Sequence, residues 1–185
     1  MKQTREYLTQ SEIDTLLKLA RRQEGSIGYR DYCIILLMYR HGLRASELCD
    51  LQWSQVDFNN ATISVKRLKN GNPSVHPLQR DELIALRKQW NETGLNRYIF
   101  ISQKKTPFAR QSLNKLFLRL QDLWQKSTKS TLKLHPHMMR HTTGYLLAEK
   151  GVDTRRIQDY LGHKKIEHTV TYTQLSSGAL RNIWD

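Results

Sequence analysis

The residues best suited to chemistry gather in the last third of the chain. His137 and Arg140 stand three positions apart in HPHMMRH, His163 follows Gly162 in LGHKK, and Tyr172 comes nine residues later. Guanidinium groups bind phosphate through paired hydrogen bonds, imidazoles move protons, and an activated phenol can act as a nucleophile. This combination is typical of a protein that grips a phosphodiester and attacks it.

Attack on a phosphodiester sets the requirements that the rest of the chain must meet. Negative charge grows on the non-bridging oxygens, so forked guanidinium groups are the natural clamp. A phenol, with a pKa near ~10, needs positive charge beside it, and the departing alkoxide needs a proton from Lys or His. The sequence offers these groups without an acidic metal cluster, which favours transfer without a metal or other cofactor. His135, His137 and His141 could suggest a metal site, but no Cys or carboxylate set completes it.

Composition points to nucleic acid as the partner. The 185 residues include 30 Lys and Arg against 17 Asp and Glu, a net charge of +13, with a pI near 9.9. This excess favours polyanions, either nucleic acid or an anionic membrane surface. No apolar run approaches the ~20 residues of a membrane span, the N-terminus MKQTREYLTQ lacks a signal-peptide core, and no basic amphipathic helix with exposed aromatics stands out. We therefore expect a cytoplasmic protein that binds nucleic acid and no membrane.

Local patterns predict one α+β domain that is mainly helical. The capping-box pattern TQSE at 9–12 starts a helix with apolar residues at helical spacing, and Gly25 ends it. A second helix covers 29–41, with the apolar run CIILLMY in the core, and a short helix begins within 43–48. Cys33 and Cys49 lie among apolar residues without a CxxC spacing, so we expect reduced core thiols.

Residues 56–78 change from helical to strand patterning. Turn clusters stand at DFNN and KNGN, ATISVK between them alternates with period two, and SVHP follows. We expect a small antiparallel meander of about three strands, with Lys69 at a hairpin tip. Pro73 and Pro77 confine the last strand to an edge or a short pairing.

Helical patterns return in the second half. Apolar stripes predict helices around 83–90 and 113–124, separated by a brief buried strand or extended segment at 98–101. Pro136 suits the first turn of a helix that ends at Gly151, and Asp153 caps another that stops at Gly162. Thr169 can cap a short segment bearing Tyr172, and the final GALRNIWD can form a C-terminal helix.

A basic run without acidic residues leads into the helix at 113–124: Lys104, Lys105, Arg110, Lys115 and Arg119. A solvated face is the plain alternative, but the net charge favours a face that follows DNA phosphates. Across the whole chain, we expect DNA contacts from Lys66, Arg67, Lys104, Lys105, Arg110, Lys115, His141, Lys164 and Lys165.

Each of these motifs is weak alone, and together they resemble one family. HGLRASEL, the meander with VKRLKNGN, HPHMMRH, LGHKK and the tyrosine of TYT look like the tyrosine recombinase (integrase) family, in the family's order, from about residue 9 to 173. The resemblance implies the fold of that family's catalytic domain. Glu47 matches an acidic position expected to orient the active-site cations. The catalytic residues that the resemblance implies are Arg44, Lys69, His137, Arg140, His163 and Tyr172.

The resemblance also implies a mechanism. Tyr172 attacks the scissile phosphate, giving a 3′-phosphotyrosyl link and a free 5′-hydroxyl, while Arg44 and Arg140 brace the non-bridging oxygens. Lys69 protonates the leaving 5′-oxygen, although the meander carries an extra residue and Lys66 lies close by. A 5′-hydroxyl from the partner strand then attacks the adduct, so neither ATP nor metal is needed. His137 assists proton transfer, and His163 hydrogen-bonds the phosphate.

The length suggests a short member of that family. Arg44 comes too early for a separate helical DNA-clamping domain before the catalytic one, so we expect one catalytic domain at 1–185, with a short arm at 1–8 and a tail at 174–185 that can pack on a neighbouring protomer. This architecture is similar to the fimbrial phase-variation recombinases, which invert a promoter-bearing DNA segment. The similarity implies double-stranded DNA with inverted repeats, a homotetramer in the synaptic complex, host DNA-bending accessory proteins and a place at the nucleoid.

Other readings of the same residues remain open. A transposon or phage integrase without its arm domain is a near variant, and a small type IB topoisomerase-like enzyme shares the chemistry without exchanging strands. A DNA-binding regulator could keep the shape and lose catalysis. The complete set of candidate catalytic residues argues against that last reading, because a degenerate copy would be expected to lose at least one of them.

Overall fold

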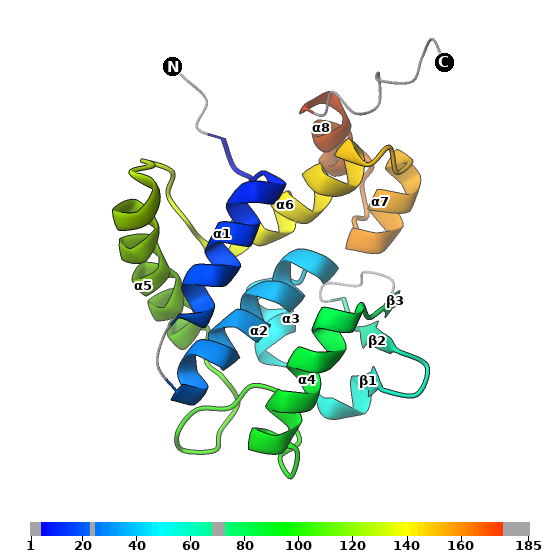
Figure 1. Cartoon of the computed structure of the whole chain (residues 1–185). Coiled ribbons are helices and arrows are strands. Elements are labelled where there is room, and N and C mark those ends of the chain that lie inside the picture. Colours follow the sequence, from blue (N-terminus) through cyan, green and yellow to red (C-terminus); the bar gives the residue numbers. More distant parts are fainter. Residues whose placement is uncertain (1–4, 23–24, 68–72, 176–185) are drawn as a thin grey trace.

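The computed structural model describes residues 5–22, 25–67 and 73–175 (Figure 1). Over these residues the fold is mainly helical with one small antiparallel sheet, as the sequence predicts. The elements are α1 (Gln10–Arg21), α2 (Gly25–His41), α3 (Ala45–Cys49), a 3-10 turn (Trp53–Gln55), β1 (Val56–Asp57), β2 (Thr62–Val65), β3 (Ser74–Pro77), α4 (Arg80–Thr93), α5 (Arg110–Thr128), α6 (Pro136–Glu149), α7 (Thr154–Leu161) and α8 (Glu167–Leu175).

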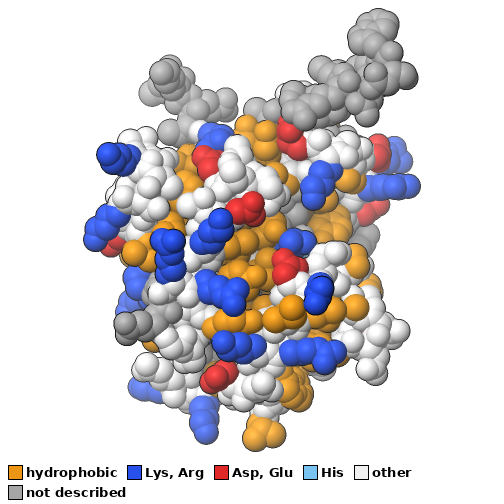
Figure 2. All heavy atoms as spheres, in the orientation of Figure 1, with side chains coloured by type: hydrophobic (Ala, Val, Ile, Leu, Met, Phe, Trp, Pro, Cys, Tyr) orange, Lys and Arg blue, Asp and Glu red, His pale blue; other side chains and the backbone are white. Residues whose placement is uncertain are grey.

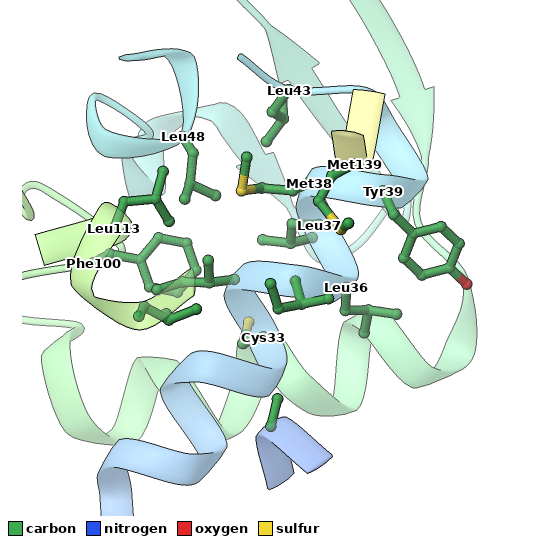
Figure 3. Close-up of a cluster of buried hydrophobic side chains, with 14 of the residues drawn as sticks. Cys33, Leu36, Leu37, Met38, Tyr39, Leu43, Leu48, Phe100, Leu113 and Met139 are labelled. Carbon is green, nitrogen blue, oxygen red and sulfur yellow. The ribbon is translucent and has the colours of Figure 1, made fainter. Parts of the chain in front are cut away.

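Helix α2 forms the centre of the core. Its apolar run from Cys33 to Met38 is fully buried, and side chains from other elements such as Phe100, Leu113 and Met139 converge on it (Figure 3). Helices α1, α4 and α6 pack against α2, and α7 and α8 pack against α6 and each other. The candidate site therefore rests on helices anchored to the most buried element of the chain. Cys33 and Cys49 are both buried and free of disulfides, as predicted.

The sheet has the strand order β1-β2-β3, with both pairings antiparallel. β3 lies at an edge, which suits the prolines near it because they cannot donate to a further strand. On β2, Ile63 pairs with His76 and Val65 pairs with Ser74. Ile63, Val65 and His76 are all buried, so this face of the sheet turns inward. Lys69, predicted at the hairpin tip, lies outside the described residues.

Helix boundaries follow capping chemistry with a few differences from the prediction. Pro136 occupies the first turn of α6, and Asp153 accepts from the backbone N–H groups of Arg155 and Arg156 at the start of α7. Gly25, expected to end the first helix, instead begins α2 with a φ of +66°. Thr169 does not cap α8, because that helix already begins at Glu167.

The segment at 98–101 is extended, with Tyr98 bridging to Gln52 and Ile101 to Pro107. Ile99 and Phe100 are fully buried, as the sequence predicts for this segment. The predicted C-terminal helix at 178–185 lies outside the described residues. Within the part that the structure describes, no helix is both long and apolar enough to cross a membrane.

The face formed by α1, α2 and α4 carries scattered Lys and Arg side chains around a band of hydrophobic ones (Figure 2). Cations of α1 and α4 also lie over aromatic rings of α2. The Arg21 guanidinium lies 5.7 Å from the Tyr29 ring and 5.5 Å from the Tyr32 ring, and Lys88 Nζ lies 4.0 Å from the Tyr29 ring. Cation–π contact and packing of the aliphatic stems account for these positions.

Candidate active site

Arg44 stands at the turn between α2 and α3. Gly42, with a φ of +58°, takes the left-handed conformation that ends α2, and Arg44 is the N-cap of α3. The Arg44 backbone N–H donates to Glu47 Oε2 at 2.9 Å, and its Nη1 donates to Glu47 Oε1 at 2.7 Å. The Arg44 side chain is 30% exposed, whereas that of Glu47 is buried. Glu47 therefore holds the helix start and the guanidinium together and leaves part of the fork open to an incoming anion.

Arg67 lies just after β2, and its side chain is fully enclosed. Nη1 donates to Glu47 Oε2 at 2.9 Å and to the Gly42 carbonyl at 3.3 Å. Nη2 donates to the carbonyls of His41, at 3.0 Å, and of Tyr160, at 2.5 Å. These bonds tie the end of α2 to α3 and to the last turn of α7. Arg67 is thus a structural cation of the site. The predicted DNA contact is corrected, because each of its two terminal nitrogens already donates to two protein acceptors.

Arg140 comes from the second turn of α6 and is also buried, at 1% exposure. Its Nη1 donates to the Gly42 carbonyl at 2.7 Å and its Nη2 to the Leu161 carbonyl at 2.5 Å. Burial, followed by repulsion from Arg44 and Arg67, lowers the pKa of Arg140 to about 9, although Glu47 opposes that shift. Three guanidinium groups therefore share one carboxylate in the described part of this site. A bound anion would relieve their repulsion.

Tyr172 is held against α6 with its phenol turned inward. The Tyr172 side chain is 4% exposed, and its hydroxyl lies 3.1 Å from His141 Nδ1. The ring packs on Gly144, where an added Cβ would lie 2.4 Å from Tyr172 Cε2. Burial raises the pKa of Tyr172, while Arg140 and Arg44 act in the opposite direction. The candidate nucleophile on α8 thus interacts electrostatically with Arg140 of α6 and with Arg44 at the start of α3.

Two further predicted histidines flank the same region. His137 is exposed, and its ring lies edge-on to that of His141, with centroids 4.5 Å apart. His163 follows Gly162, which ends α7 in the left-handed conformation, and its ring lies 6.2 Å from the Tyr172 ring. His163 Nδ1 shares a hydrogen bond of 2.9 Å with Thr169 Oγ1. Burial, followed by Arg140 and Arg44, lowers the pKa of His163 to about 3, so this imidazole is neutral.

The segment before α1 reaches the same helix. Tyr7 stacks on Tyr145 with ring centroids 3.8 Å apart, and the Leu8 N–H donates to Thr142 Oγ1 at 3.0 Å. The Glu6 carboxylate lies 2.8 Å from His135 Nε2. This segment therefore places a carboxylate near the start of α6, beside the histidines of HPHMMRH.

Of the predicted set, the structure brings Arg44, Glu47, Arg140, His163 and Tyr172 together, with His137 beside them. His141, expected to contact DNA, is partly buried and faces Tyr172 instead. Lys69, the predicted proton donor to the leaving oxygen, lies outside the residues that the structure describes. The remaining predicted DNA contacts are all exposed: Lys66, Lys104, Lys105, Arg110, Lys115, Lys164 and Lys165.

Sequence reasoning missed the role of Arg67, the partner of His141 and the bond between Thr169 and His163. The first two carried a local signal. Arg67 continues the period-two alternation of Ile63 and Val65, and His141 stands one helical turn after His137. Within the described chain, no three His, Cys, Asp or Glu side chains gather in a way that could hold a metal ion.

Comparison with known proteins gives this arrangement its family. The chain belongs to the phage integrase family, whose model matches residues 6–178, and this confirms the resemblance seen in the motifs. Among its relatives is the type 1 fimbriae regulatory protein FimE of Escherichia coli, which is 42% identical over 98% of this chain and 91% of that protein. FimB of the same organism is 41% identical over 98% of this chain and 90% of that protein.

More distant relatives are named as recombinases. The tyrosine recombinase XerC of Bacillus pumilus is 30% identical over 97% of this chain and 57% of that protein. Among solved structures, the crystal structure of XerA recombinase superposes with a TM-score of 0.80 at 27% identity, covering 98% of this chain and 64% of that chain. The predicted fold is therefore confirmed.

Proposed function

We propose that this protein is a site-specific DNA recombinase that cleaves and rejoins DNA through Tyr172 and inverts a segment between inverted repeats, switching a fimbrial promoter. The observation that carries the proposal is a group of three arginines: Arg44 and Arg67 bond to the Glu47 carboxylate, and Arg140 is buried beside them on the Gly42 carbonyl. The charges of Arg140 and Arg44 act on the Tyr172 phenol. Positive charge gathered beside a phenol suits attack on a phosphodiester.

In this mechanism the exposed part of the Arg44 fork and the buried Arg140 hold the non-bridging oxygens of the scissile phosphate. Tyr172 forms the bond to phosphorus, and the 5′-oxygen leaves with a proton from Lys69. His137 assists proton transfer, and His163 hydrogen-bonds the phosphate as a neutral imidazole. The bond energy is kept in the 3′-phosphotyrosyl adduct, so rejoining needs no ATP, metal or other cofactor.

The likeness to FimE and FimB supports fimbrial switching as the biological setting. The partners proposed on this basis are double-stranded DNA with inverted repeats, three further copies of the chain in a synaptic tetramer, and host proteins that bend DNA. Such work takes place at the nucleoid in the cytoplasm. The exposed lysines at 104–105 and 164–165, with Lys66, Arg110 and Lys115, supply the phosphate contacts outside the site.

The test is covalent trapping on a supercoiled plasmid that carries a promoter segment between candidate inverted repeats, without magnesium. We expect the wild-type protein to form a DNA adduct that survives denaturant, and Tyr172→Phe to form none. Tyr145→Phe is the matched control, because Tyr145 lies on α6 beside Gly144 and its ring stacks on that of Tyr7. Its adduct should equal that of the wild type.

The products in the same tubes separate the alternatives. Inverted plasmid supports recombination, whereas relaxed plasmid without inversion would point to a topoisomerase-like enzyme. Site-specific DNA binding without any adduct would show a regulator and would contradict the catalytic proposal.

A further inference from the structure

We propose that His141 is the proton acceptor for the Tyr172 nucleophile, a catalytic role beyond those assigned to His137 and His163. This inference rests on the proposed function and deepens it. Its first support is geometric: Nδ1 of His141 lies 3.1 Å from the Tyr172 hydroxyl, the distance expected between a general base and the proton that it removes.

The packing of α6 and α8 keeps the two rings at this distance. Their ring centroids are 5.8 Å apart, at an interplanar angle of 62°. Gly144, three residues after His141, lets the Tyr172 ring lie directly on the helix backbone. The phenol is therefore placed by shape, and its hydroxyl forms a hydrogen bond with His141.

Burial and the charges around His141 keep its imidazole neutral, so that it can accept a proton. Burial is the largest cause. His137 and Arg140 of the same helix, and His135 at its N-cap, add to it, so the pKa of His141 falls to about 4. Glu6, from the segment packed beside α6, acts in the opposite direction. From α8, the facing group is the Tyr172 phenol itself. A neutral imidazole whose Nδ1 accepts from the phenol carries its own proton on Nε2.

An arriving phosphodiester changes this balance in the direction that the reaction needs. Its negative charge offsets the nearby arginines, and the charge increases further as the pentavalent transition state forms. Both effects raise the proton affinity of His141 at the moment when the phenol must lose its proton. Without DNA the same imidazole is too weak a base to ionise the phenol, so the nucleophile stays unreactive.

The proton movements balance over the cycle. The phenol O–H bond breaks and its proton moves to Nδ1 of His141, while Oη bonds to phosphorus. The bond from phosphorus to the 5′-oxygen breaks, and that oxygen takes a proton from Lys69. On rejoining, the incoming 5′-hydroxyl returns a proton to Lys69, and the imidazolium of His141 returns its proton to the tyrosine oxygen as the phosphotyrosyl bond breaks.

The test uses His141→Asn, because the asparagine side-chain oxygen can stand near the Nδ1 position. It can accept the phenol's hydrogen bond but cannot take up its proton. The measurement is the single-turnover rate of adduct formation on a nicked duplex carrying the site. We expect a loss of roughly 100-fold or more, as for removal of a general base. Gln174→Asn is the control, because Gln174 is an exposed residue of α8, and its rate should match the wild type.

A more acidic phenol separates proton transfer from positioning. Placing 3,5-difluorotyrosine at position 172 should restore most of the lost rate in His141→Asn and change the wild-type rate little. A slow variant that the fluorinated phenol does not rescue would show a structural role and overturn the inference. An unchanged or faster rate in His141→Asn would mean that His141 only holds the phenol in place, which overturns it as well.

A second readout does not depend on activity. In nitrogen NMR of histidine-labelled protein without DNA, Nδ1 of His141 should appear as an unprotonated acceptor whose signal moves in Tyr172→Phe. A protonated Nδ1 would reverse the hydrogen bond and overturn the inference even if DNA cleavage is normal. Absence of any wild-type adduct on the correct site would instead contradict the proposed function, and with it the proton transfer.

Discussion

Arg67 and Arg140 donate to the same backbone oxygen, the carbonyl of Gly42, at 3.3 Å and 2.7 Å. The two cations come from distant parts of the chain, one from the end of the meander and the other from α6. Each also holds the last turn of α7, through the carbonyls of Tyr160 and Leu161. The turn that presents Arg44 and the turn that presents His163 are therefore fixed to each other by two buried guanidiniums.

Arg67→Met should destabilise the protein strongly. The change removes the counter-charge of one Glu47 oxygen and the buried hydrogen bonds that Arg67 donates to the carbonyls of His41 and Tyr160. Loss of one partner of a buried pair costs about 3–5 kcal/mol, and we expect about 3 kcal/mol here because Glu47 keeps its bonds to Arg44. Urea unfolding measures the difference. Lys66→Met is the control, since Lys66 is the exposed neighbour in the chain, and equal losses in the two variants would contradict the structural role of Arg67.

Arg44→Lys should separate catalysis from stability. The Arg44 backbone N–H still donates to Glu47, so the start of α3 is kept, and the free energy of unfolding should change by less than about 1 kcal/mol. The ammonium cannot form the paired hydrogen bonds of a guanidinium, so the rate of adduct formation should fall roughly 100-fold. Unfolding and single-turnover cleavage on the same preparation check both parts. A variant that cleaves at the wild-type rate would remove Arg44 from the clamp.

Most of the fold follows from local sequence signals. The capping box at 9–12, Pro136 and Asp153 mark where helices begin, and the period-two alternation before KNGN marks the meander. These signals work because they reflect backbone hydrogen bonding and side-chain direction, which depend on neighbours in the chain. Gly25 begins α2 and does not end α1, since a glycine with positive φ suits the connection before a helix as well as the one after it.

The candidate site was harder to derive, because its contacts join segments distant in sequence. Arg67 illustrates the difficulty: Ile63, Val65 and Arg67 share the buried face of the strand pattern, but the high net positive charge of the chain favours a surface position for any single arginine. The period-two alternation of buried residues predicts the enclosed position of Arg67 correctly. The contact of His141 with Tyr172 has no local signature that fixes it, because it depends on how α8 packs on α6 at Gly144.

Gly144→Ala tests this packing, because a substitution that normally stabilises a helix should here lower the stability of the protein. In a helix interior, alanine is more favourable than glycine by about 1 kcal/mol. At this position the new Cβ would lie 2.4 Å from Tyr172 Cε2 and 2.5 Å from Cδ2, so the ring must move away. We expect net destabilisation of about 1–3 kcal/mol and faster nitration of Tyr172 by tetranitromethane.

The control for Gly144→Ala is the same substitution in a Tyr172→Ala background. With the ring removed, the clash disappears, and alanine at position 144 should stabilise the protein by about 1 kcal/mol. Destabilisation of similar size in both backgrounds would show that Gly144 is needed for a reason unrelated to Tyr172.

Stability should fall with acid because buried histidines are held neutral. His76 is 1% exposed, stacks on Tyr160 with ring centroids 3.8 Å apart, and has its Nδ1 3.1 Å from Nδ1 of His41. Burial, followed by His41 and Arg67, lowers the pKa of His76 to about 3. The unfolded chain, with a histidine pKa near ~6.5, takes up the proton first. The stability is therefore complete above about pH 6.5 and is lost as the pH falls toward the folded-state value.

For His76 alone this loss amounts to about 1.4 kcal/mol per pH unit, or about 2 kcal/mol at pH 5. His141 and His163, whose pKa values are also lowered, to about 4 and about 3, act in the same direction. Unfolding by urea between pH 7 and pH 4.5 measures the slope. His76→Gln should flatten it by about one proton, because glutamine does not titrate. A slope that stays the same in His76→Gln would mean that His76 is protonated in the folded protein, against its enclosure between His41, Tyr160 and Arg67.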